Sequence, residues 1–241
     1  MSIRDLSSDD SYISDLPVVK NLIKIRKLNF NKRVTFFVGE NGTGKSTLLE
    51  AIAVKYGFNA EGGTINFSFS SNATHSSLSD YLFLTKAAKR PRDGFFLRAE
   101  SFYNVASYID ELDKQKAASS PIIRSYGGVS LHEQSHGESF LSLVQNRFGG
   151  NGLYILDEPE AALSPSRQMT LLVHIRNLVK NNSQFIIATH SPILLSFPGA
   201  DIFELTEDDI KQTEYQKTEH YILTKQFLNK PEQMLKYLFE D

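Results

Sequence analysis

The segment GENGTGKS, residues 39–46, constrains this chain more than any other feature. It follows the apolar run 34–38, which predicts a buried strand, and it precedes residues 47–56, whose apolar positions have the spacing of a helix. A strand, a glycine-rich loop and a helix start in this order can cradle a polyphosphate, because backbone N–H groups and the helix dipole point at the same place. The segment therefore predicts a nucleoside triphosphate site, and the alternative is a glycine-rich turn with an incidental lysine.

The residues of this loop have separate expected roles. Lys45 would reach the β- and γ-phosphates, and the Ser46 hydroxyl would bind Mg²⁺. The three glycines would let the backbone bend around the phosphates. The full set expected to contact the nucleotide is Gly39, Glu40, Asn41, Gly42, Thr43, Gly44, Lys45, Ser46 and Thr47.

Size and composition limit the classes of protein that this chain can be. With 241 residues, 41% of them hydrophobic, it can bury the core of one α/β domain, with or without an inserted lobe. The formal net charge of −2 gives no overall electrostatic footprint for nucleic acid. The lack of cysteine excludes disulfides, thiolate zinc sites and cysteine nucleophiles. No apolar run approaches the length of a membrane span, so we expect no membrane insertion and a cytoplasmic location.

Apolar patterning predicts an α/β fold with a mostly parallel sheet. Buried strands alternate with helices along the chain, and this order places helices on both faces of the sheet. Strands are expected at 22–28, 34–38, 65–69, 95–99, 153–156 and 185–188, and helices at 47–56, 102–112, 165–179 and near 234–238. Two further elements are expected at 202–205 and 221–223, and residues up to 17 are expected to form a loosely tethered arm.

Two carboxylates follow the buried strand predicted at 153–156. Asp157 and Glu158 would lie at the carboxyl edge of a parallel sheet, the edge that also carries the phosphate loop. We expect Asp157 to hold the metal, directly or through its water shell, and Glu158 to orient the attacking water as general base. The alternative is a helix cap after an ordinary buried strand.

A histidine follows the next buried strand at the same edge. His190 comes directly after 185–189 and could donate a hydrogen bond to the γ-phosphate or to the attacking water. A lone histidine is often a surface or core residue, which is the alternative here. The expected catalytic set is therefore Glu158, His190 and Lys45.

Four segments together resemble the ordered motif set of ABC-type ATPases, which are P-loop NTPases. They are GENGTGKS, SHGES at 135–139, LYILDEPEAALSP at 153–165 and ATHSP at 188–192. In that family the signature serine and glycine of one subunit close over the γ-phosphate bound by the other. The resemblance implies ATP and Mg²⁺ as cofactors, a signature segment with Ser135, Gly137 and Glu138, and an ATP-dependent homodimer that holds two nucleotides.

The departures from the family pattern are informative. His136 replaces the usual first glycine of the signature, and Glu138 stands where transporter ATPases commonly have glutamine. The segment is thus more similar to the form found in chromosome-maintenance, RecF-like and Rad50-like ATPases. The layout, including GFFLRAESFYN at 94–104, resembles small stand-alone bacterial ABC-type ATPases that are usually labelled AAA-family ATPases. Glu100 stands roughly where the parent families have a magnesium-sensing glutamine; alternatively, it is a carboxylate at a helix N-terminus.

The resemblance implies one ABC-type ATPase domain over residues 1–241, with an inserted helical lobe at 100–148 that carries the signature segment. The implied function is Mg²⁺-dependent ATP binding and hydrolysis that drives head-to-head dimerisation, in DNA maintenance or defence. The alternatives are the ATPase subunit of a membrane transporter and a nucleotide-dependent switch with negligible turnover. A nucleic acid or protein partner is also expected: Lys86, Lys89, Arg90 and Arg92 could contact a phosphate backbone, unless they form only a solvated loop.

Overall fold

The computed structural model describes residues 1–3, 11–67, 76–86, 88–115 and 122–240, and a six-stranded sheet lies at its centre. The strand order is β4-β5-β6-β2-β7-β8, where all neighbours pair in parallel except β7 and β8. The strands are β2 (Val34–Val38), β4 (Asp93–Arg98), β5 (Gly152–Asp157), β6 (Gln184–Ala188), β7 (Asp201–Leu205) and β8 (Ile210–Thr213). The predicted α/β fold with a mostly parallel sheet is confirmed.

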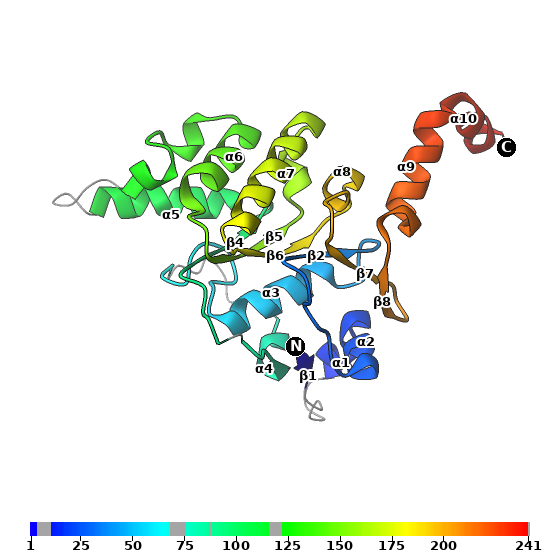
Figure 1. Cartoon of the computed structure of the whole chain (residues 1–241), viewed down its shortest axis with the longest axis horizontal. Helices are drawn as coiled ribbons and strands as arrows, with labels where there is room; N and C mark the ends of the chain where they lie inside the picture. The colour runs from blue at the N-terminus through cyan, green and yellow to red at the C-terminus, as the bar shows by residue number, and fades with distance from the viewer. Residues whose placement is uncertain (4–10, 68–75, 87, 116–121, 241) are drawn as a thin grey trace.

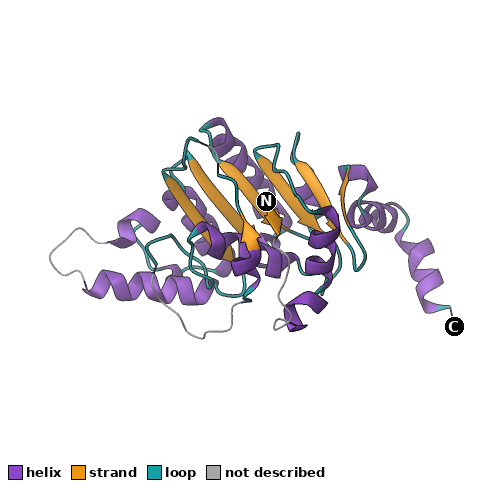
Figure 2. Ribbon diagram, turned by 90° about the horizontal axis from the view of Figure 1, so that it is seen from below, coloured by secondary structure: helices purple, strands orange, loops and turns teal. Residues whose placement is uncertain are grey.

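Helices cover both faces of the sheet (Figures 1 and 2). One face carries α1 (Ser11–Asp15), α2 (Pro17–Ile25), α3 (Lys45–Tyr56) and α4 (Leu78–Tyr81). The other carries α5 (Phe102–Gln115), α6 (His136–Arg147), α7 (Pro165–Lys180) and α8 (Pro192–Leu195). Phe36 and Phe37 are consecutive on β2 but belong to the apolar clusters of opposite faces, because successive side chains of a strand alternate.

Parallel pairing brings the carboxyl ends of four strands together. Asp157 is the register partner of both Arg98 and Ala188, and Ala188 is also the partner of Phe37. The ends of β4, β5, β6 and β2 therefore lie side by side, and the residues that follow them meet at one edge of the sheet.

The segment between β4 and β5 is helical. It contains α5, the short 3₁₀ helices η1 (Ile122–Tyr126) and η2 (Leu131–Glu133), and α6. This segment corresponds to the lobe expected at 100–148, whose behaviour as a separate unit stays a prediction.

Three local expectations were wrong. The strand expected at 22–28 overlaps helix α2, because Pro17 occupies its first turn and Val18, Val19 and Leu22 share a buried face. Residues 65–67 form a turn with Ile65 exposed; the rest of the strand expected at 65–69 lies outside the described residues. The described part of the amino-terminal arm is packed: β1 (Ser2–Ile3) pairs with β3 (Leu82–Phe83), and Ile13 is buried.

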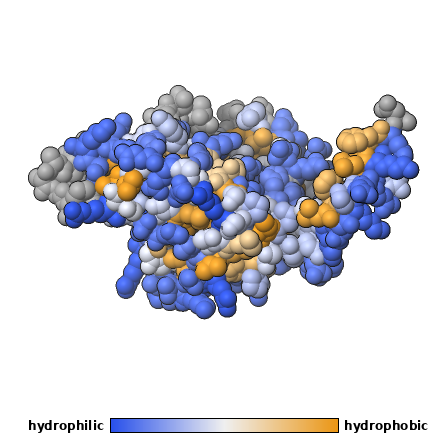
Figure 3. All heavy atoms as spheres, turned by 90° about the horizontal axis from the view of Figure 1, so that it is seen from above, coloured by the Kyte–Doolittle hydropathy of each residue, from blue (hydrophilic) through white to orange (hydrophobic). Residues whose placement is uncertain are grey.

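The carboxyl-terminal helices project from the body of the molecule (Figures 1 and 2). After the 3₁₀ helix η4 (Tyr215–Lys217), the chain forms α9 (Glu219–Asn229) and α10 (Pro231–Phe239), in which no residue is buried. Apolar side chains are exposed along them, as Figure 3 shows, among them Leu228, Tyr237, Leu238 and Phe239. Across the described residues, no helix combines the length and apolar character of a membrane span.

Candidate nucleotide site

The phosphate loop connects β2 to α3 and depends on two crowded glycines. Gly39 has a φ of +148°, and a Cβ there would collide with the backbone oxygen of Leu205. Gly44 caps α3 with a φ of +91°, and a Cβ there would lie 2.5 Å from a methyl carbon of Val18. Both positions exclude side chains for steric and conformational reasons. The loop is therefore held in a fixed shape against the sheet and α2.

Lys45 is buried within this loop. Its ammonium group donates hydrogen bonds to the carbonyl oxygens of Gly39 and Glu40, both at 2.8 Å. Burial lowers the pKa of Lys45, whereas the negative charges of Glu158 and Asp157 act in the opposite direction. The ammonium group thus lies on the concave side of the loop, beside the carboxylates at the edge of the sheet.

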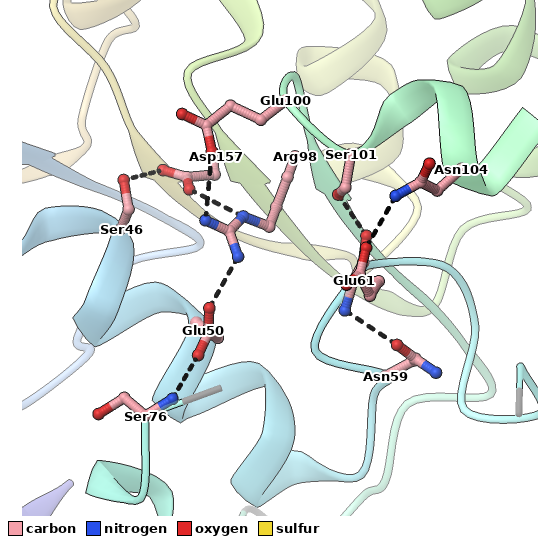
Figure 4. Close-up of polar contacts among 10 residues, drawn as sticks. All are labelled: Ser46, Glu50, Asn59, Glu61, Ser76, Arg98, Glu100, Ser101, Asn104 and Asp157. Atoms are coloured by element: carbon pink, nitrogen blue, oxygen red, sulfur yellow. Dashed lines mark hydrogen bonds and ion pairs between the residues drawn. The ribbon is translucent and has the colours of Figure 1, made fainter. Parts of the chain in front are cut away.

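The two expected metal ligands lie next to each other. The Ser46 hydroxyl donates a hydrogen bond of 3.0 Å to Asp157 Oδ1 (Figure 4). Burial raises the pKa of Asp157 to about 6. The charge of Arg98 and the hydrogen bond from Ser46 act in the opposite direction but do not outweigh burial. A hydroxyl and a carboxylate are hard oxygen ligands that fit Mg²⁺, whose shell in such sites is completed by phosphates and water. No group of three or more His, Cys, Asp or Glu side chains among the described residues forms another metal site.

Arg98 is a residue of this edge that sequence reasoning missed. Its guanidinium lies 3.5 Å from Asp157 Oδ2, 2.7 Å from Glu50 Oε2 and 3.7 Å from Glu100 Oε2 (Figure 4). Arg98 therefore connects the end of β4 to the metal-ligand candidate on β5 and to α3. Arg98 could have been found from the sequence, because it lies near the end of the strand expected at 95–99 and the carboxyl ends of parallel strands meet at one edge of the sheet. Glu100 lies in this network and its side chain is 85% exposed.

Glu158 adopts a backbone conformation that is unusual for its residue type. Its φ and ψ are both 50°, in the left-handed region, and its N–H donates to the carbonyl of Ala188 at 3.0 Å. This conformation costs a non-glycine residue about 1 kcal/mol. Its Oε1 atom lies 3.6 Å from His190 Nε2, so the two residues expected to act on the attacking water are neighbours.

His190 is held from two sides. Its backbone N–H donates to Glu160 Oε1, and its Nδ1 lies 2.9 Å from Nε2 of His220 on α9. Burial lowers the pKa of His190, and the charge of Lys45 adds to this effect. A cleft of about 450 Å³ beside the loop is lined by Glu40, Asn41, His190, Glu219, His220 and Leu223. No sequence pattern indicated His220.

The expected signature segment forms the first turn of α6. The Ser135 hydroxyl and N–H both donate to Glu138 Oε2, at 2.6 and 3.1 Å, and Arg167 pairs with Glu138 Oε1 at 3.1 Å. Gly137 is buried, and a Cβ there would lie 2.8 Å from the carbonyl oxygen of Ala162, so a larger residue would not fit without a shift. Within the described part of the chain, no hydrogen bond or ion pair of Ser135 or Glu138 reaches residues 39–46.

Comparison with known proteins finds sequence relatives that match over part of their length and solved structures of low sequence identity. The chain is 26% identical over 39% of its length to the Vibrio cholerae serotype O1 biovar El Tor protein named "Retron Vc95 probable ATPase", and 35% identical over 32% of its length to an uncharacterized ABC transporter ATP-binding protein of Haemophilus influenzae. These matches span only 22% and 29% of the two relatives. Two of the solved structures found are an SMC head domain from Thermotoga maritima (17% identity, TM-score 0.43, 78% of this chain and 92% of that one) and a dimeric bacterial ABC transporter cassette (16% identity, TM-score 0.46, 79% and 89%).

Two family matches cover the phosphate loop and the site residues up to His190, whereas His220 lies outside both. Residues 19–55 match an AAA domain, and residues 71–195 match the AAA ATPase domain. The second match extends over more than half of the chain and includes the segments with Ser135, Asp157, Glu158 and His190. The chain therefore belongs to the AAA ATPase domain family.

Proposed function

We propose that the protein binds ATP with Mg²⁺ at the phosphate loop and hydrolyses it only when a second copy completes the site. The observation that carries this proposal is the division of the candidate residues into two groups. Lys45, Ser46, Asp157, Glu158 and His190 gather at one edge of the sheet, whereas Ser135 and Glu138 lie at the start of α6 and bond elsewhere. A partner's α6 would supply the missing contacts to the γ-phosphate.

In the proposed reaction each residue acts mainly by position and charge. Lys45 would neutralise charge on the β- and γ-phosphates, and Ser46 with Asp157 would hold a Mg²⁺ ion, which would balance the remaining charge. Glu158 orients a water molecule for attack and accepts its proton, and His190 donates a hydrogen bond to a γ-phosphate oxygen. Opening of the dimer after hydrolysis would release the products, which makes ATP turnover a timer for an assembly that acts in DNA maintenance or defence.

A mixing experiment tests the composite site. Lys45→Ala removes the loop lysine, and Ser135→Arg blocks the signature segment, so each variant alone should be inactive. Their heterodimer pairs an intact loop with an intact signature segment in one of its two sites, and an equimolar mixture should recover up to about a quarter of wild-type turnover. The measurement is phosphate release at saturating ATP.

The matched control mixes Lys45→Ala with Glu158→Gln. Both substitutions damage the loop side of a site, so no heterodimer has an intact site and activity should stay absent. Absence of recovery in the first mixture, in samples shown to contain heterodimers, would mean that one chain does not complete the site of another.

A basic cleft supports the proposal of a nucleic acid partner. The cleft, of about 540 Å³, lies at the amino ends of the strands, opposite the phosphate loop, and is lined by Lys27, Arg33, Lys86, Lys89 and Arg90. No aspartate or glutamate is among its described lining residues, and none of these five cations lies within 4.0 Å of a described carboxylate. Such a group of cations would release counterions when it binds a phosphate backbone.

Charge reversal in the cleft tests this partner. Lys89→Glu with Arg90→Glu should weaken binding of a single-stranded oligonucleotide about tenfold or more and reduce the dependence of log K on log salt by about 1.4, at roughly 0.7 per phosphate contact. Fluorescence anisotropy at several salt concentrations measures both quantities. Arg176→Glu with Lys180→Glu on α7 makes the same charge change at exposed positions and should have little effect. Equal effects of the two double variants would contradict the assignment.

A further inference from the structure

His220 contacts the site from a distant part of the chain. It lies in the first turn of α9, after the β7–β8 hairpin, and its Nε2 is 2.9 Å from Nδ1 of His190. The two rings are 5.1 Å apart between centroids. The other ring nitrogen of His190, Nε2, lies 3.6 Å from Glu158 Oε1. The three side chains thus form a row from α9 to the end of β5.

A hydrogen bond between the two imidazole nitrogens requires one proton, carried either by His220 Nε2 or by His190 Nδ1. Which nitrogen carries it determines the tautomers of both rings, and so what faces Glu158 and what surrounds His220 Nδ1. If His220 donates, His190 Nδ1 accepts and the proton of a neutral His190 lies on Nε2, facing the Glu158 carboxylate. If His190 donates instead, an unprotonated Nε2 faces that carboxylate, and two acceptors oppose each other. The Glu158 end therefore favours donation by His220.

The opposite end of the row favours the same direction. His220 Nδ1 is buried and has no hydrogen-bond partner among the described residues. When His220 donates from Nε2, Nδ1 is an unpartnered acceptor; in the reverse arrangement it would be an unpartnered buried N–H, which is the rarer and costlier case.

Burial, more than any neighbouring charge, favours the neutral form of both rings. Burial and the charge of Lys45 lower the pKa of both histidines. Glu158 acts in the opposite direction on His190, and Glu219, Glu204 and Glu40 do so on His220. A neutral pair has a defined tautomer, so the direction of the shared hydrogen bond decides which nitrogen of His190 can donate.

We propose that His220 is a positioning residue for ATP hydrolysis: it donates its Nε2 proton to His190 Nδ1 and holds His190 in the tautomer that can donate from Nε2 to a γ-phosphate oxygen. This inference rests on the proposed role of His190. It also joins α9, and with it the projecting helix pair, to the part of the site that contacts the γ-phosphate.

Two substitutions separate the hydrogen bond from the packing of the ring. His220→Leu removes the donor and should lower kcat about tenfold, by analogy with the loss of an orienting partner of a metal-ligating histidine. KM for ATP should stay within about twofold. His220→Gln keeps an amide N–H that can reach Nδ1 and should recover most of the loss. His174→Leu removes a different imidazole, bonded to Gln145 at 3.1 Å on α7, and should leave turnover unchanged.

The tautomer gives a readout that a merely structural role would not move. In ¹⁵N spectra of the full-length protein, His190 should carry its proton on Nε2 in the wild type and in His220→Gln, and should change to a mixture of tautomers in His220→Leu. Wild-type kcat in His220→Leu, or equal losses in the two variants, would overturn the inference. His190→Ala distinguishes the causes: if it also retains wild-type kcat, the proposed role of His190 fails instead.

Discussion

Glu158→Gln should lower kcat for ATP hydrolysis by about 10³-fold, within the range for loss of a general base, while ATP still binds with an affinity within a few-fold of wild type. Glutamine has nearly the same shape but cannot accept the proton of the attacking water. Its amide can still form hydrogen bonds beside His190, so the backbone turn after β5 should be retained. Because the nucleotide is no longer consumed, the ATP-bound dimer should accumulate.

Two measurements check this variant. Phosphate release at saturating ATP gives kcat, and size-exclusion chromatography with light scattering, with and without ATP, gives the oligomeric state. Glu207→Gln, in the turn after β7, makes the same chemical change outside the site and should behave as wild type. Unchanged turnover in Glu158→Gln would remove Glu158 from the mechanism, whereas lost turnover with a monomer in ATP would contradict dimerisation.

Asp157→Asn should abolish hydrolysis and, in the absence of metal and nucleotide, stabilise the fold at neutral pH. Burial raises the pKa of Asp157 to about 6 from its ordinary value of 3.8. A raised carboxyl pKa means that the folded state holds the proton more tightly than the unfolded state. The contribution of this group to the free energy of unfolding is therefore fully present below about pH 4 and is lost as pH rises through about 6. Above that pH the free energy of unfolding is lower by about 3 kcal/mol. Asparagine is neutral at every pH and avoids that loss.

The measurement is urea unfolding in EDTA at several pH values between 4.5 and 7.5. The advantage of Asp157→Asn over wild type should grow as pH rises and reach about 1–3 kcal/mol, with the lower figure allowing for the weakened pairing of Arg98. A variant less stable than wild type at pH 7.5 would contradict the prediction.

Asp93→Asn is the control, because the pKa of Asp93 is shifted in the opposite direction and the expected change in stability has the opposite sign. Burial disfavours this carboxylate as well, but the Gly149 N–H, the Tyr154 hydroxyl and Arg147 outweigh burial and lower its pKa. Its contribution is present above the unfolded pKa and lost only in more acidic solution. Asp93→Asn should therefore destabilise the protein at pH 7.5.

The sequence was sufficient to predict the site residues that directly follow strands. It was not sufficient to predict those that tertiary packing brings to the site. Lys45, Asp157 and His190 could be predicted to meet because parallel strands end at one edge, whatever the details of the connections. His220 reaches the site through the placement of α9, which depends on the β7–β8 hairpin and on contacts that no local pattern encodes. Arg98 and Glu50 pair across 48 positions for the same reason.

The error at 22–28 has a local cause. Residues 22–28 alternate between apolar and polar, but Val18, Val19, Leu22 and Ile25 also have helical spacing, and the proline at 17 favours a helix start. A seven-residue window contains too few positions to separate the two periods. The helix is favoured over the strand because the apolar side chains of α2 pack in one cluster with those of α3.

The left-handed backbone of Glu158 has a consequence for attempts to improve this protein. Glycine is the residue that adopts φ and ψ of 50° most readily, so a selection for thermal resistance alone would favour glycine at position 158. The same substitution removes the carboxylate from beside His190. Stabilising libraries should therefore keep this position fixed, since here thermal resistance and turnover impose opposite demands on one residue.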